Sequence, residues 1–196
     1  ANNGFSYRVN RGGTTLYRAG RQAIGLSDIV LDAQFRLVNE EGWIPAAALQ
    51  ALFKAPTGMR SEGLGSGTPD GGLFALMEGG SGRYAGYANF WMLFLGGAEP
   101  LESISRRISF AWMVGGEVNL SHPISALVQL NSNTALFRGT GFSQLDDDPL
   151  DLTLGFKGGG KTWFWQAAFT EDPGANDPSA DFTVFLSLGY RPLLKR

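Results

Sequence analysis

Residues 155–162, GFKGGGKT, match the phosphate-loop pattern G-x-x-x-x-G-K-T letter for letter. A phosphate loop needs a strand before it and a helix after it, because backbone N–H groups and the helix dipole hold the phosphates. The residues that follow, TWFWQAAFT at 162–170, alternate between the two faces of a strand instead. The glycines are therefore better explained by a hairpin turn than by a nucleotide site.

The single histidine, His122, lies in a predicted turn, Ser121-His122-Pro123. A serine hydrolase needs a serine, a histidine and an orienting polar group that converge in space, and neighbouring Ser121 points the wrong way for that. With one histidine and no cysteine, a zinc site lacks ligands. We therefore expect no catalytic residue and no cofactor, and we expect that the protein is not an enzyme.

Four acidic residues gather around the end of a predicted polar loop and the start of the next strand: Asp146, Asp147, Asp148 and Asp151. Carboxylates of this kind could hold calcium, but their spacing lacks the ordered pattern of a dedicated calcium loop. Solvation of the loop, or a bridge to lipopolysaccharide counter-ions, explains the cluster as well. No metal site is expected from it.

The elements that position these residues are strands. Residues 181–191, DFTVFLSLGYR, place apolar side chains at every second position, and residues 27–38 repeat this alternation. Side chains alternate between faces along a strand, so each segment has one apolar and one polar face. About ten such strands are predicted, at residues 4–10, 27–38, 43–54, 73–78, 83–95, 105–119, 124–137, 150–157, 162–170 and 181–191. Residues 46–53 are rich in Ala and Leu, which makes a helix the competing local prediction there.

The predicted connections alternate in length. Residues 39–42, 79–82, 120–123 and 158–161 are short turns, whereas the long connections cover residues 11–26, 55–72, 96–104, 138–148 and 171–179. Outer-membrane barrels have short periplasmic turns and long outer loops, and an even strand number places both termini in the periplasm. The pattern therefore predicts an all-β, antiparallel transmembrane β-barrel in a bacterial outer membrane, formed by residues 1–196 as one domain.

Aromatic residues are predicted at both ends of the strands. Trp43, Trp163, Trp165 and Tyr190 lie toward the short turns, and Phe53, Phe94, Phe137 and Phe182 lie toward the long loops. Two aromatic girdles are expected where a barrel meets the two membrane surfaces. A soluble sandwich or lipocalin-like barrel is the alternative, but it predicts mostly polar outer faces.

Several segments resemble a known family: GLSDIVLDAQFRLVNEEGW, FKAPTG, GSGTPDGG, DPLDLTLGFKGGGKTWFWQAAFTED and SADFTVFLSLGYRP. They are similar to an uncharacterised family of bacterial outer-membrane barrels, a domain of unknown function loosely similar to outer-membrane transporters. The resemblance covers roughly residues 20–192. Members of that family carry more chain before this region, so the resemblance leaves open that the chain is part of a larger barrel. It implies no catalytic residue.

Composition excludes other classes. The formal net charge is −2, which gives no reason to expect nucleic acid as a partner. Charged residues make up 17% of the chain, below the ~25% usual for soluble domains. No run of about 18 apolar residues is present, so no transmembrane helix is predicted.

The polar rows of the strands are predicted to line the barrel lumen. They carry both signs of charge: Arg8, Asp28, Asp32, Gln34, Arg36, Lys54, Arg107, Glu117, Asp151, Lys157, Asp181 and Arg191. Such charges must pair or be hydrated. Ion pairs could fill the narrow bore, or the row could line a polar conduit. The sequence thus predicts a narrow channel or transporter component for small solutes, with outer-membrane lipid around it. The alternative is a structural barrel that anchors or encloses a partner protein in the outer membrane, with loops 55–72 and 138–148 as the contact surfaces.

Overall fold

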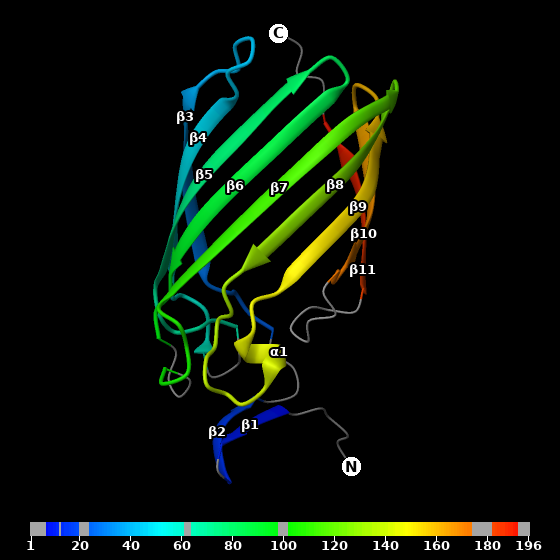
Figure 1. The fold of residues 1–196 in the computed structure, drawn as a ribbon. Helices are drawn as coiled ribbons and strands as arrows, with labels where there is room; N and C mark the ends of the chain where they lie inside the picture. The colour runs from blue at the N-terminus through cyan, green and yellow to red at the C-terminus, as the bar shows by residue number, and fades with distance from the viewer. Residues whose placement is uncertain are drawn as a thin grey trace.

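The computed structural model describes residues 7–11, 13–19, 24–60, 64–97, 102–173 and 182–191. Its main element is one nine-stranded antiparallel sheet in the order β11-β10-β9-β8-β7-β6-β5-β4-β3, so each strand pairs with its neighbour in sequence (Figure 1). The strands are β3 (Ile29–Val38), β4 (Ala46–Ala55), β5 (Asp70–Ser81), β6 (Tyr84–Phe94), β7 (Ile108–Ser121), β8 (Ile124–Asn133), β9 (Leu150–Gly159), β10 (Trp163–Glu171) and β11 (Phe182–Tyr190).

These nine strands confirm the period-two prediction, with ends shifted by a few residues. Residues 46–55 form β4, so the helix considered for this Ala-rich segment is wrong. Its backbone pairs with β3 on one side and with β5 on the other, and this pairing overrides the weak helix propensity of alanine and leucine.

The N-terminal prediction is only partly right. Residues 7–11 do form a strand, β1 (Tyr7–Arg11), but it pairs with β2 (Thr14–Ala19) in a separate two-stranded sheet. Residues 14–19 were predicted as loop. The β1–β2 hairpin lies beyond one end of the large sheet (Figure 1) and adds no strand to it.

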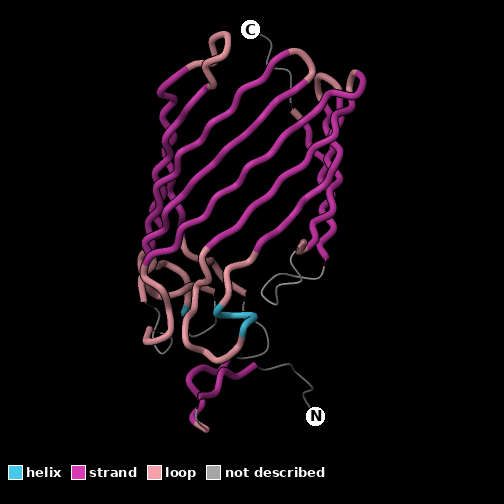
Figure 2. The backbone as a smooth tube through the Cα atoms, in the orientation of Figure 1, coloured by secondary structure: helices cyan, strands magenta, loops and turns pink. Residues whose placement is uncertain are grey.

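The connections alternate as predicted. Tight turns join β5 to β6, β7 to β8 and β9 to β10 at one end, and longer loops, one of which contains the single-turn helix α1 (Ser143–Asp146), lie at the other end (Figure 2). Gly42, in the β3–β4 connection at the same end, and Gly82, in the β5–β6 turn, have φ values of 61°, a conformation that glycine adopts without strain. We call the two ends the short-turn end and the long-loop end.

The sheet is curved but not closed. Within the described residues, β3 and β11 each have a neighbour on one side only. The described strands therefore form an open antiparallel sheet of nine strands, and the closure into a barrel of about ten strands stays a prediction. Because nine is odd, β3 begins at the long-loop end and β11 finishes at the short-turn end. The prediction that both ends of the chain share one side does not hold for the described strands, because β1 does not join the sheet.

The two faces of the sheet differ in chemistry and in exposure. Each of the nine strands places large apolar side chains on one face, and many of these are exposed, such as Phe35 (66%), Phe182 (65%) and Leu188 (74%). The opposite face carries the polar row, whose side chains shield one another. Side chains of strands that are not neighbours meet on this face, since Glu117 on β7 reaches Lys157 on β9, so the sheet curls toward the polar face, which is concave. No second layer covers the apolar face in the described part of the chain.

Candidate functional site

The polar concave face is the candidate functional site. A ladder of hydrogen bonds crosses it from β6 to β9 around Glu117. Its carboxylate accepts a hydrogen bond from the Tyr87 hydroxyl at 2.6 Å and pairs with the Lys157 ammonium at 2.5 Å. Ser125, between them on β8, also bonds to Glu117. Glu117 and Lys157 were predicted on this face, whereas Tyr87 was not, because its phenol sits among apolar neighbours in sequence.

A second group of bonds continues this lining on β8 and β9. The Asn131 amide donates to Asp151 at 3.1 Å, and the Gln129 amide donates to Asn131 at 3.2 Å. At the β3 edge, the Gln50 amide donates to Asp32 at 3.0 Å. Predicted residues Asp32 and Asp151 therefore lie on the concave face, and each is satisfied by an amide of the adjacent strand.

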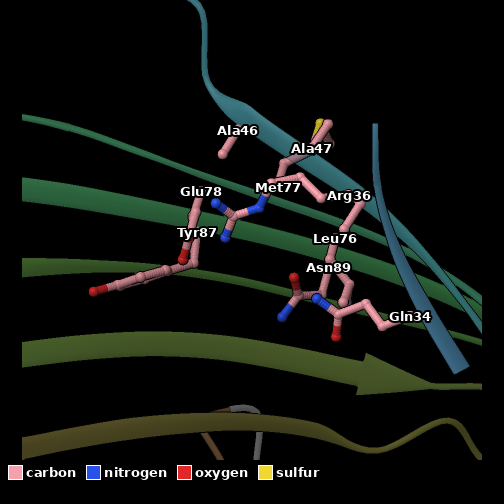
Figure 3. A pocket seen from close by; sticks show the side chains of 10 residues that line it. Gln34, Arg36, Ala46, Ala47, Leu76, Met77, Glu78, Tyr87 and Asn89 are labelled. Atoms are coloured by element: carbon pink, nitrogen blue, oxygen red, sulfur yellow. The ribbon is translucent and has the colours of Figure 1, made fainter. Parts of the chain in front are cut away.

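Predicted residues Gln34 and Arg36 line a cavity of about 240 Å³. Figure 3 shows their side chains and those of Glu78, Tyr87 and Asn89 projecting into the same space from β3, β5 and β6. An amide, a guanidinium, a carboxylate and a phenol can together donate and accept hydrogen bonds in several directions. This part of the concave face can therefore bind water or a small polar solute.

At the long-loop end, Lys54 is enclosed by two carboxylates. It pairs with Asp70 and, at 3.4 Å, with Asp28, and it donates to the Ser66 hydroxyl at 2.6 Å. Asp28 also accepts the backbone N–H groups of Gly58, at 2.8 Å, and Ser66, at 3.1 Å. We call Asp28, Lys54, Asp70 and Ser66 the loop knot. The knot joins the segments 53–58 and 65–72.

The loop knot has a clear electrostatic cause and consequence. The Asp28 side chain is only 6% exposed, yet the N–H of Gly58, that of Ser66 and the ammonium of Lys54 together hold the pKa of Asp28 below its ordinary value. Gly58 and Gly65 fit here because a Cβ on either would meet the backbone of the loop or the Asp28 carboxylate. Asp28 and Lys54 thus fix the long loop at the rim of the sheet and do not line its wall.

The remaining predicted residues are dispersed. Arg107 pairs with Glu102 and is half exposed at the long-loop end, away from the strand wall. Arg191 directly follows β11 at the short-turn end. Arg8 lies in β1, with a side chain outside the described part of the structure, and Asp181 lies outside the described residues.

The ion pairs of the described residues run laterally. Each joins neighbouring strands, strands separated by one other, a strand and an adjacent loop, or two residues of one loop. None of these described pairs reaches across the concavity. The described pairs therefore lie along the sheet, and the choice between an interior filled by ion pairs and a polar conduit stays a prediction.

Sequence reasoning missed an apolar part of the concave face. The rings of Phe74 on β5 and Trp91 on β6 stack with centroids 6.2 Å apart. Gln50 of the polar row pairs with Phe74, and Phe74 pairs with Trp91, so the two rings lie on the same face as Gln50. Strict alternation around Gln50 and Asn89, combined with the strand pairing, would have located them. The concave face thus carries an apolar patch at Phe74 and Trp91, whereas β8 presents the amides Gln129 and Asn131 there.

The other motifs have local roles. Asp146 accepts the N–H groups of Thr140 and Gly141, and the N–H of Thr140 holds the pKa of Asp146 below its ordinary value. Asp148 accepts the N–H of Ala135 at 2.7 Å. The acidic residues therefore point to different partners. Among the described residues, no three His, Asp or Glu side chains are grouped closely enough for a metal ion.

The phosphate-loop pattern and the histidine are also placed. Residues 163–171 form β10, so the glycine-rich turn lacks the following helix that a phosphate loop needs. Instead, a Cβ on Gly158 would meet the Trp165 ring. His122 and Ser121 are exposed at the β7–β8 turn.

No family model matches the chain, and no curated protein is similar to it. In the part of the chain that the structure describes, no helix is long and apolar enough to cross a membrane.

Proposed function

We propose that this chain forms the wall of a bacterial outer-membrane β-barrel that acts as a narrow channel or transporter component for small solutes. The observation that carries the proposal is the continuous apolar surface of the convex face, to which all nine strands contribute exposed side chains. Monomeric soluble proteins rarely expose apolar patches of more than a few hundred Å². Lipid is the partner that suits such a surface when its strands alternate apolar and polar residues.

Aromatic placement supports the same orientation. Trp43, Trp163 and Tyr190 are exposed at the short-turn end, and the Trp163 and Tyr190 rings contact each other at 4.8 Å. At the long-loop end, Phe169 and Phe182 stack at 6.2 Å. Amphipathic rings favour the membrane–water boundary. The short turns would face the periplasm and the long loops the outside.

The open edges define what a closed barrel requires. Eight antiparallel pairings separate β3 from β11, so these two edge strands run in the same direction. Direct pairing between them would be parallel, whereas outer-membrane barrels are antiparallel throughout. An all-antiparallel closure therefore takes an odd number of further strands between β11 and β3. A symmetric pair of these sheets cannot supply it with both copies in one orientation, because every β11 would again meet a parallel β3.

The polar concave face supports a path for solutes. Glu117 and Lys157 pair along the wall, and a cavity lined by Gln34, Arg36 and Glu78 opens on the same face. A hydrated interior lets such groups stay charged, which a dry one would not.

Fractionation tests the membrane part of the proposal: the chain should appear in the outer membrane and migrate faster on a gel before heating than after. Planar-bilayer recording tests the channel part, since the folded chain should then give discrete conductance steps. A band whose migration does not change on heating would contradict the barrel. A heat-modifiable band without conductance steps in the bilayer would contradict only the channel.

The loop that contains α1 favours a second candidate, a barrel that binds a partner protein. Leu136, Phe142 and Leu145 are exposed there, although the loop is ordered by Asp146 and Asp148. The double substitution Phe142→Ser and Leu145→Ser should release a partner that co-purifies with the native chain. A chain that is always recovered alone would argue against this function.

A further inference from the structure

A cavity of about 350 Å³ opens at the short-turn end of β8, β9, β10 and β11. Its lining includes Ser125, Lys157, Lys161, Gln166, Arg191 and the ring of Phe164. Three of the lining residues are cations, and no carboxylate lines the cavity in the described part of the chain. We call it the basic pocket.

Strand register brings these residues together. Ser125 lies opposite Lys157, and Lys157 lies opposite Gln166, so the three share one row of the concave face. The N–H of Arg191 donates to the carbonyl of Thr162 at 2.6 Å, which brings Arg191 beside the turn that carries Lys161. The arrangement therefore follows from the sheet itself and not from a single loop.

The charges of the basic pocket are not neutralised within the described structure. Lys157 is paired with Glu117. The Lys161 ammonium forms no hydrogen bond or ion pair with any described residue, and the described contact of the Arg191 guanidinium is with the Phe164 ring, 6.0 Å from its centroid. Two unneutralised cations that share a concave surface raise its affinity for anions, because each adds to the local positive potential.

Phe164 gives the pocket an apolar side. A Cβ on Gly189 would collide with the Phe164 ring, so glycine at this position lets the ring lie against β11. The ring is thereby fixed next to Arg191. A ligand that binds here meets a charged side and an aromatic side at once.

We propose that the basic pocket binds a small organic anion, whose carboxylate or phosphate group is held by Lys161 and Arg191 and whose apolar part contacts Phe164. Arginine binds either group through two parallel N–H donors, and lysine adds a point charge. The volume suits a small metabolite, since ligand pockets range from roughly 300 to 1,000 Å³. The positive charge of the basic pocket comes from the side chains of Lys161 and Arg191. Anion binding here therefore does not need the helix that follows the glycines of a phosphate loop.

This site deepens the proposed function, because it names the class of solute that would enter at the short-turn end. Binding itself does not depend on transport. The two can therefore be tested in separate assays on the same folded chain.

The binding test uses the full chain, folded in detergent, and titrates butyrate, its uncharged counterpart butyramide, and inorganic phosphate while tryptophan fluorescence is followed. Trp165 lines the pocket and provides the signal. Butyrate should bind at least about tenfold more tightly than butyramide, because hydrogen bonds between charged partners are roughly twice as strong as neutral ones. The double substitution Lys161→Gln and Arg191→Gln should remove this preference, whereas Arg138→Gln at the long-loop end should leave it unchanged.

Equal affinity for butyrate and butyramide together with no binding of phosphate would overturn the site, and so would a double variant that still prefers the anion. If the double variant does not fold, each single substitution is measured instead, and each should lower the preference. Phosphate binding alone would identify a phosphate group as the feature recognised, and butyrate binding alone would identify a carboxylate. In the bilayer, the double variant should shift selectivity away from anions. If butyrate binds but the bilayer shows no conductance steps, the channel would be contradicted and the basic pocket would still be supported.

Discussion

The loop knot and the basic pocket lie at opposite ends of the same sheet and treat their cations differently. Lys54 has two carboxylates and a hydroxyl around it, and its side chain is only 18% exposed. Lys161 and Arg191 have no carboxylate partner among the described residues. A cation enclosed by acceptors organises the chain around it, whereas cations that share a cavity without acceptors are available for a ligand. The comparison separates charges that build the fold from charges that can bind.

The largest expected effect concerns the wall between the two ends. Val128 and Gln129 are adjacent on β8, with Val128 on the exposed apolar face and Gln129 on the concave one. Val128→Arg should destabilise the chain in lipid by about 2–4 kcal/mol, the effect of an arginine near the bilayer midplane. Gln129→Arg should have a much smaller effect. Urea unfolding in lipid vesicles measures both.

If Val128→Arg and Gln129→Arg were equally tolerated, the apolar face would not contact lipid. The loop knot and the basic pocket would then not lie on opposite sides of a membrane. A soluble sheet would accept Val128→Arg as readily as any exposed position.

The next effect concerns the loop knot. Lys54→Met leaves Asp28 and Asp70 without their cation and should lower the free energy of unfolding by roughly 1.5–3 kcal/mol, the range for hydrogen bonds to charged groups. Lys161→Met should change it by less than about 0.5 kcal/mol, as for other surface positions. Denaturant unfolding in detergent gives both values. If Lys161→Met were the more destabilising substitution, the assignment of the two ends would be reversed.

The nine strands of the sheet could be predicted because each has one apolar and one polar face, so the signal is local. The separate β1–β2 hairpin could not be, because residues 4–10 alternate like the other strands. Only the choice of pairing partner distinguishes β1 from the nine strands of the sheet. Whether the sheet closes into a barrel likewise depends on its edge strands and cannot be predicted from any single segment.

The site was predicted residue by residue but not as an arrangement. The polar parity placed Glu117, Lys157 and Asp151 on the correct face. It could not reveal that Asp70 meets Lys54, because that contact depends on a register set across a long loop. The basic pocket was missed because its residues also come together only through strand register. In addition, Lys157 and Lys161 belong to the glycine-rich segment 155–162, whose phosphate-loop pattern is typical of another fold.

Acid should affect the loop knot through Asp28. Its folded-state pKa lies below the ordinary value of 3.8, chiefly because it accepts the N–H of Gly58. A carboxyl with a depressed pKa contributes stability above its unfolded value, and this stability is lost as the pH falls through the folded value. Hydrogen exchange at Gly58 and Ser66 should therefore stay slow until the pH is well below 3.8.

Asp28→Asn provides the test of that pH dependence. It should speed exchange at Gly58 and Ser66 near neutral pH and remove the acid transition, whereas Asp32→Asn on the strand wall should leave the transition in place. An unchanged transition in Asp28→Asn would assign it to another carboxyl of the loop.

The smallest effect connects the ladder to the basic pocket. Glu117 holds Lys157 at 2.5 Å and so withdraws part of the positive charge from the cavity. Glu117→Gln keeps an acceptor for the Tyr87 hydroxyl but removes the negative charge. Butyrate affinity should then rise by up to about fivefold, since a partly exposed ion pair is worth about 0.2–1 kcal/mol. Glu78→Gln, on β5 of the same face, is the matched control and should leave the affinity unchanged. A fall in affinity for Glu117→Gln would mean that Glu117 positions Lys157 for the ligand and does not compete with it, and Lys157 would then join Lys161 and Arg191 as a residue that holds the anion.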